Sequence, residues 1–156
     1  RRNLNLKWLV RALLCALFSA MPGTPQSTIS TSITTYNLTT LEKAVYRRVN
    51  LERASHRVPA LRWNEELAMA ARNHAASMAA RGFFSHEDPV FGNVKRRLDS
   101  LNIRWSRCAE NLYAGDVDRL ADEAVTNWLL SPDHQKIMLN SLHNETGVGI
   151  AFLNPD

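Results

Sequence analysis

The segment Phe83–Pro89 constrains this chain more than any other, because it holds a histidine between a helix end and a proline. A predicted helix stops at Gly82, since glycine tolerates the left-handed conformation just past a helix end. Two adjacent aromatic rings, Phe83 and Phe84, are expected to anchor the following loop in a core. His86 should therefore be presented to its surroundings from a fixed position.

Apolar residues at helical spacing predict five helices, at about residues 39–57, 64–81, 94–101, 117–130 and 131–139. Thr39 and Glu42 have the spacing of a capping box at the first start. Asn64 and Ser131 are suitable N-cap residues for two later starts. Residues 146–152 alternate small and bulky side chains, which predicts a core strand whose glycines allow close packing.

Most charged side chains on these helices are expected to face solvent. Arg53 falls opposite the apolar face of the first helix, and the basic run 95–97 is interpreted as a solvated face of the third. His74 instead lies on the apolar face of the second helix. We therefore predict that His74 is a hydrogen-bonded core residue.

The positive charge of the chain is concentrated at its N-terminus. Four of its nineteen basic residues lie in residues 1–20, which contain no acid. The remainder therefore has fifteen basic and fifteen acidic residues, and its net charge is zero. A nucleic-acid-binding domain draws much of its affinity from excess positive charge. The neutral remainder therefore excludes nucleic acid as the expected partner.

The first twenty residues have the layout of a secretory signal peptide. A basic start precedes an apolar stretch from Trp8 to Phe18, and small residues follow. We therefore predict a signal peptide over residues 1–20, a flexible linker rich in Ser, Thr and Pro over 21–38, and a folded domain over 39–156. Arg11 interrupts the apolar run, which is short for a stable membrane span. An uncleaved membrane anchor is the alternative.

The chain contains two cysteines, Cys15 and Cys108. If Cys15 leaves with the signal peptide, Cys108 has no partner and no internal disulfide forms. A domain of this size has a large enough core to be stable without one. We interpret Cys108 as a small core residue rather than a nucleophile.

Three side chains on separate predicted elements are candidates for one cleft: His86, Glu110 and His134. Imidazole nitrogen and carboxylate oxygen are suitable ligands for zinc and similar divalent ions. Asn111 and Ser131 are the further candidates for ligand contact in the same cleft. The alternative interpretation is a structural network of hydrogen-bonded polar side chains, and the residues alone leave both open.

Several motifs occur together in a characteristic order: 61–64 (Leu-Arg-Trp-Asn), 78–86 (Met-Ala-Ala-Arg-Gly-Phe-Phe-Ser-His), 109–112 (Ala-Glu-Asn-Leu), Trp128 with 131–134 (Ser-Pro-Asp-His), and 147–149 (Gly-Val-Gly). Over about residues 41–153 the chain resembles the bacterial, SCP-like extracellular branch of the CAP superfamily. The resemblance implies an α/β/α sandwich, an α+β fold with a central antiparallel sheet between helices. It also implies a cleft with His and Glu residues that binds divalent metals in some members and lipids in others.

By the resemblance, His86 matches the first cleft histidine, Glu110 the cleft glutamate and His134 the second histidine. The chain departs from the family pattern in three respects. Ala109 and Asp133 stand where the family has glycine. Ser131 stands where animal and plant members have a second glutamate. Relatives also continue into a final aromatic strand, so two alternatives are open: this chain is truncated and lacks the last strand, or the edge of its sheet is closed differently.

From these features we predict a secreted, monomeric binding module without a stable membrane span in its mature form. Its cleft is expected to take a divalent metal such as zinc, a lipid or a cell-wall-derived ligand. The three predicted metal ligands are His86, Glu110 and His134. The alternative is a metal-dependent hydrolase with Glu110 as general base. His74 is expected to lie outside this cluster.

Overall fold

A computed structural model describes residues 11–20 and 37–153 of the chain. Within these ranges the elements, in chain order, are β1 (Arg11–Ala20), α1 (Leu38–Ser55), β2 (Arg62–Trp63), α2 (Glu65–Arg81), α3 (Val94–Ser100), β3 (Arg107–Asp116), α4 (Leu120–Leu130), α5 (Pro132–Met138) and β4 (Glu145–Phe152). None of the helices in these ranges is both long and apolar enough to cross a membrane.

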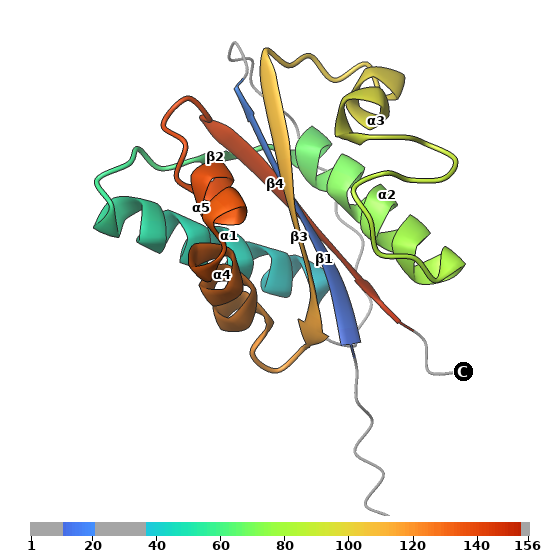
Figure 1. Cartoon of the computed structure of the whole chain (residues 1–156), viewed down its shortest axis with the longest axis horizontal. Helices are drawn as coiled ribbons and strands as arrows, with labels where there is room; N and C mark the ends of the chain where they lie inside the picture. Colours follow the sequence, from blue (N-terminus) through green and yellow to red (C-terminus); the bar gives the residue numbers. More distant parts are fainter. Residues whose placement is uncertain (1–10, 21–36, 154–156) are drawn as a thin grey trace, which may run out of the picture.

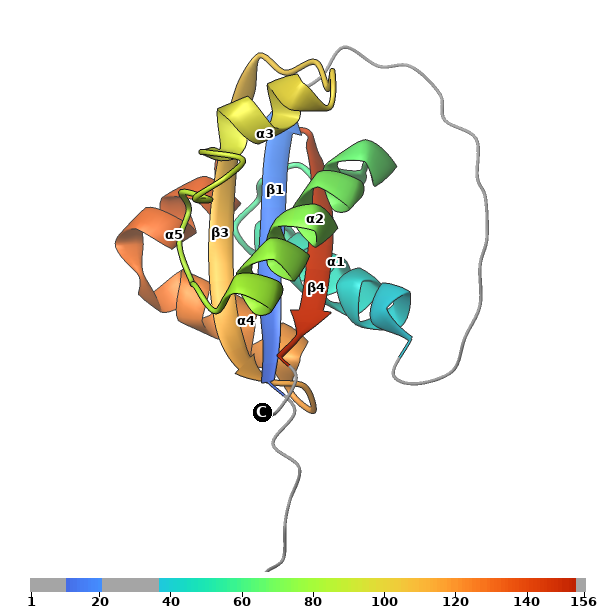
Figure 2. The same ribbon diagram turned by 90° about the vertical axis from the view of Figure 1, so that its right-hand side faces the viewer.

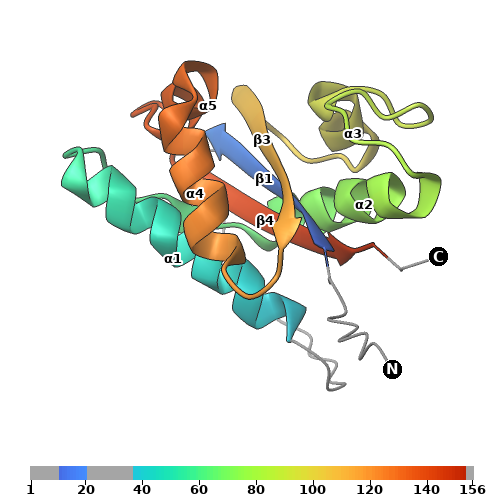
Figure 3. The same cartoon turned by 60° about the horizontal axis from the view of Figure 1, so that its bottom comes forward.

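The strands form one sheet in the order β2-β4-β1-β3. Strand β1 pairs antiparallel with β3 on one side and with β4 on the other, while the short β2 runs parallel to β4. Helices α2 and α3 cover one face of the sheet, and α1, α4 and α5 cover the other (Figure 1, Figure 2 and Figure 3). The predicted α/β/α arrangement with a central antiparallel sheet is confirmed.

One of the two inner strands of the sheet, β1, comes from the segment that we predicted to be a signal peptide. Leu17 is buried in the core beneath α2, and its neighbours Ala16 and Phe18 are buried in the core on the opposite face. A strand buried on both faces is a continuous apolar run, and the central part of a signal peptide has the same pattern. Local sequence therefore does not distinguish the two. Residues 1–10 and the predicted linker residues 21–36 lie outside the described ranges.

The start of α1 differs from the capping box that we predicted. The helix begins at Leu38, within the predicted linker, and Asn37 occupies the N-cap position without a side-chain cap bond. Glu42 is fully buried and pairs with Arg72 of α2 at 2.7 Å. The capping box is therefore wrong: Glu42 ties α1 to α2 instead of closing the helix end.

Arg53 is buried, although we expected it to face solvent. Its guanidinium group donates to the carbonyl oxygens of Pro59 at 2.8 Å, Met138 at 2.7 Å, Asn140 at 3.0 Å and His143 at 3.1 Å. Four carbonyl acceptors replace the water that the cation loses on burial. Arg53 thus fixes the chain that follows α5 against the end of α1.

The predictions for α2 and β4 are confirmed. The side chain of Asn64 caps α2 by accepting from two backbone N–H groups. Gly147 and Gly149 of β4 lie directly against the α2 backbone, where an added Cβ atom would collide with main-chain atoms. The two glycines therefore bring this helix unusually close to the sheet.

Candidate functional site

The loop after α2 holds His86 in place, as predicted, but only one of the two aromatic rings anchors it. Gly82 ends the helix with a φ of 66°. Phe83 packs against the core, whereas Phe84 is exposed. The loop is tightened further by Asp88, whose carboxylate accepts from the backbone N–H groups two and three residues later at 2.8 and 3.0 Å. This local turn supplies the rigidity that we attributed to Phe84.

His86 contacts Glu110, as the sequence predicts. Its Nδ1 lies 2.8 Å from Oε2 of Glu110. The His86 side chain is 58% exposed, while that of Glu110 is only 2% exposed. A carboxylate can only accept here, so Nδ1 carries the proton and Nε2 of a neutral His86 is an acceptor. A buried acid thus orients an imidazole at the surface.

Arg97 completes this arrangement, and we did not anticipate it. One arm of its guanidinium group donates to Oε1 of Glu110, and the other donates to the carbonyl oxygens of His86 at 2.9 Å and Gly92 at 2.7 Å. The prediction that the whole run 95–97 is solvated is therefore wrong. Arg97 lies three residues after Val94, on the apolar face of α3, and this spacing is the signal that could have identified it.

His74 is a buried, hydrogen-bonded core residue, as predicted, but it lies beside the cluster rather than outside it. Its Nε2 is 3.0 Å from the carbonyl oxygen of Ser85 and 4.0 Å from Oε2 of Glu110. Burial lowers the pKa of His74, against the opposing effect of Glu110. The imidazole is therefore neutral at pH 7, and it holds the loop through its contact with the carbonyl oxygen of Ser85.

Acid should destabilise the domain through its buried histidines. Burial lowers the pKa values of His74 and His143 below the ordinary 6.5. Below pH 6.5 these histidines take up protons in the unfolded chain before they do so in the folded chain. Their contribution to the free energy of unfolding is therefore fully present above pH 6.5 and falls on acidification. Asp88 has a pKa of about 2 because hydrogen bonds outweigh its burial, and its contribution is lost between pH 3.8 and 2.

Urea unfolding between pH 7.5 and 5 measures this effect. The free energy of unfolding should fall by up to about 1.4 kcal/mol per pH unit for each buried histidine. His74→Gln should show a shallower slope, whereas His56→Gln, at an exposed position, should match the wild type. Parallel slopes for His74→Gln and the wild type would refute the assignment.

The remaining predicted site residues form a second group. Asn111 donates to the carbonyl oxygen of His134 at 3.0 Å, and Nδ1 of His134 lies 2.8 Å from the hydroxyl of Ser131. Ser131 precedes α5 at the N-cap position, as predicted, although its hydroxyl makes no cap bond. Glu110 and Asn111 are consecutive in β3 and therefore point to opposite faces of the sheet. This alternation separates the two groups.

As they lie, the three predicted metal ligands do not fit a shared site. Among the described residues, no three His, Cys, Asp or Glu side chains are grouped so that they could hold a metal ion. Each carboxylate oxygen of Glu110 already has a partner, one in Arg97 and the other in His86. The ring of His134 is turned to Ser131. The three-residue metal site stays a prediction without geometric support.

Cys108 has the surroundings of a structural cysteine. It is a free thiol, half-buried in β3 against the core beneath α2 and α3. Burial raises the pKa of its thiol. A thiol with a raised pKa is a poor nucleophile at neutral pH, in agreement with the role that we predicted.

Comparison with known proteins gives the family. The family model described as "Cysteine-rich secretory protein family" (CAP) matches residues 46–155. The "Uncharacterized membrane protein YlbC" of Bacillus subtilis is 34% identical over 112 residues, which is 72% of this chain and 32% of that protein. The chain thus spans about a third of the length of this relative.

Two solved structures share the fold. An extracellular protein containing an SCP domain from Bacillus anthracis superposes with a TM-score of 0.70 and 27% identity over 79% of this chain and 43% of that one. An outer surface protein from Borrelia burgdorferi gives a TM-score of 0.62 and 18% identity over 77% of this chain and 96% of that one. By its sequence match and by its fold, this chain belongs to the cysteine-rich secretory protein (CAP) family.

Proposed function

We propose that this chain is an exported, monomeric binding module whose ligand contacts the exposed edge of His86. The observation that carries the proposal is the imidazole 2.8 Å from the buried carboxylate of Glu110. Apolar side chains could fill the space of the buried Glu110 and Arg97 equally well, so packing alone does not account for this ion pair beneath a surface histidine. Its benefit is a fixed acceptor, Nε2, directed at a ligand.

The ligand class that matches this acceptor best is a hydroxyl- and amide-bearing fragment of the cell wall, because such groups donate hydrogen bonds. Asn111, Ser131 and His134 lie on the other side of β3 and are proposed as further contacts for a fragment long enough to pass around this edge strand. A lipid is a weaker match to a charged network. A divalent metal such as zinc would find one nitrogen at His86, so it should bind weakly and lose that binding in His86→Ala.

Export is supported by the relatives rather than by the N-terminal pattern, because the apolar stretch of residues 11–20 also forms strand β1. The similar Bacillus anthracis protein is described as extracellular, and the Borrelia protein as an outer surface protein. On this basis we propose that the chain works outside the cytoplasm.

Co-sedimentation with insoluble peptidoglycan tests the binding proposal. The wild type should pellet with the polymer, and His86→Ala should weaken this binding at least tenfold, because the ligand loses its main acceptor. His56→Ala removes an exposed histidine at the end of α1 and should pellet like the wild type. Equal binding by wild type and His86→Ala, or none by the wild type, contradicts the proposal.

The same experiment separates binding from hydrolysis. A carboxylate–histidine pair is also the arrangement that orients a general base. A hydrolase acting at this site would use Nε2 of His86 as its base rather than Glu110, whose oxygens pair with Arg97 and His86. Release of soluble fragments by the wild type, and not by His86→Ala, would assign the chain to hydrolysis instead.

A further inference from the structure

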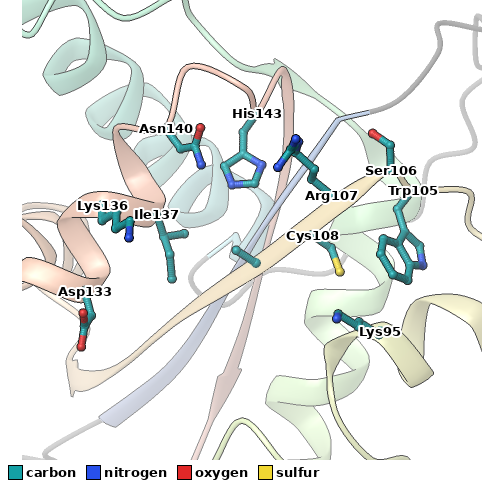
Figure 4. Close-up of a pocket in the computed structure, with 11 residues that line it drawn as sticks. Lys95, Trp105, Ser106, Arg107, Cys108, Asp133, Lys136, Ile137, Asn140 and His143 are labelled. Carbon is teal, nitrogen blue, oxygen red and sulfur yellow. The ribbon is translucent and has the colours of Figure 1, made fainter.

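A pocket lies at the exposed edge of β3, between α3 and α5 (Figure 4). Its volume is about 510 Å³, within the range of small-molecule sites. The lining residues that matter here are Lys95, Trp105, Arg107, Lys136, Ile137 and His143. His86, Glu110 and His134 do not line it, so this pocket is separate from the site already described.

Three positive charges from different elements face this pocket. Lys95 belongs to α3, Arg107 begins β3 and Lys136 lies in α5, whereas Asp133 is the one acid in the lining. Within the described ranges, none of the three cations forms an ion pair with a carboxylate. Three cations against one acid create a field that attracts an anion.

A buried imidazole gives the pocket a hydrogen-bonding group as well. His143 is only 4% exposed, and its Nδ1 has no hydrogen-bond partner among the described residues. Figure 4 shows its ring on the pocket wall, next to the side chain of Arg107. Buried polar atoms nearly always have partners, so an unpaired one beside a pocket indicates a place for a ligand atom. The carbonyl of His143 is held by Arg53, which fixes the position of the residue.

The pocket also has apolar walls. Trp105 uses its indole N–H to bond Asp99 at 2.8 Å, which turns the ring into a fixed surface. The ammonium group of Lys95 lies 5.9 Å from the centre of that ring. Ile137 of α5 adds an aliphatic surface to the lining. A ligand here meets an aromatic ring as well as cations.

We propose that this pocket binds a small organic anion, in which a carboxylate or phosphate group is joined to an apolar or aromatic body. Arg107 presents a planar fork that fits either anionic group with two parallel hydrogen bonds. Lys95 and Lys136 add point charges, and His143 adds a hydrogen bond. Trp105 and Ile137 contact the apolar body. This goes beyond the proposed function, because it uses none of the residues around His86.

Calorimetric titration of the full chain with phenyl phosphate and with benzoate tests the proposal. At least one should bind saturably, and the tighter of the two identifies phosphate or carboxylate as the preferred group. Phenol, which lacks the charge, and inorganic phosphate, which lacks the ring, should each bind at least tenfold more weakly. Raising the salt concentration should weaken binding, since the contacts are largely ionic.

Matched variants locate the binding. Arg107→Ala and Lys136→Ala should each weaken binding of the tighter probe about tenfold, and both positions are exposed, so folding should be retained. Arg104→Ala removes an exposed arginine that does not line the pocket and should bind like the wild type. His86→Ala should also leave this binding unchanged, which separates the result from the proposed function. Absence of saturable binding, or equal affinity in Arg107→Ala and Arg104→Ala, overturns the proposal.

Discussion

Removing residues 1–20 is expected to abolish cooperative folding of the domain. Strand β1 separates β3 from β4, and β3 has no other neighbour in the sheet. The deletion leaves two unpaired strand edges and takes Ala16, Leu17 and Phe18 out of the two cores. Far-UV circular dichroism and thermal unfolding should show loss of the cooperative transition.

Two further measurements make this result specific. A synthetic peptide of residues 11–20 should restore the transition when added to the truncated chain. In the full chain, Phe18→Ala should lower the free energy of unfolding by about 3–5 kcal/mol, whereas Leu51→Ala, on the exposed surface of α1, should change it little. A truncated chain that unfolds like the full chain would show that β1 is dispensable, as the predicted removal of a signal peptide requires.

Replacing Arg97 by methionine is expected to lower the free energy of unfolding by about 3–5 kcal/mol, because it leaves the buried carboxylate of Glu110 without its cation. The carbonyl oxygens of His86 and Gly92 lose their donor as well. Urea unfolding measures the change. Binding at His86 should weaken together with stability, since the loop that carries it is released.

The neighbouring arginine is the control for this prediction. Arg96 is exposed on the same helix, so Arg96→Met should change stability by less than about 0.5 kcal/mol. Adding Glu110→Gln to Arg97→Met should recover part of the loss, because the uncompensated buried charge is then removed. Equal effects of Arg96→Met and Arg97→Met would show that the buried pair contributes nothing to stability.

Local sequence determined the two ends of α2 and the buried faces of the helices. Asn64 and Gly82 mark the two ends of α2 because capping depends on neighbouring residues alone. The apolar spacing of each helix identifies the side that meets the sheet. The family pattern also placed His86 and Glu110 in one cleft with His134, and the structure has the first two in contact at 2.8 Å.

Strand β3 shows where local pattern was insufficient. It carries Glu110 and Asn111 in its buried centre, so its sequence lacks the alternation of a half-buried strand. Because the sequence did not predict a strand here, nothing indicated that these two adjacent side chains point to opposite faces of a sheet. The single cleft expected for His86, Glu110 and His134 consequently becomes two groups.

Only the tertiary structure decided which charges are buried and which segment completes the sheet. Glu42, Arg53 and Arg97 all lie in helices at positions that sequence assigns to caps or to solvent. Each is buried because its partners, such as the carbonyl of His143 for Arg53 and the carboxylate of Glu110 for Arg97, lie outside its own helix. The same holds for β1, whose pairing with β3 and β4 depends on contacts more than eighty residues away along the chain. Periodicity records a residue's neighbours in sequence, whereas burial of a charge or a strand depends on partners that folding brings together.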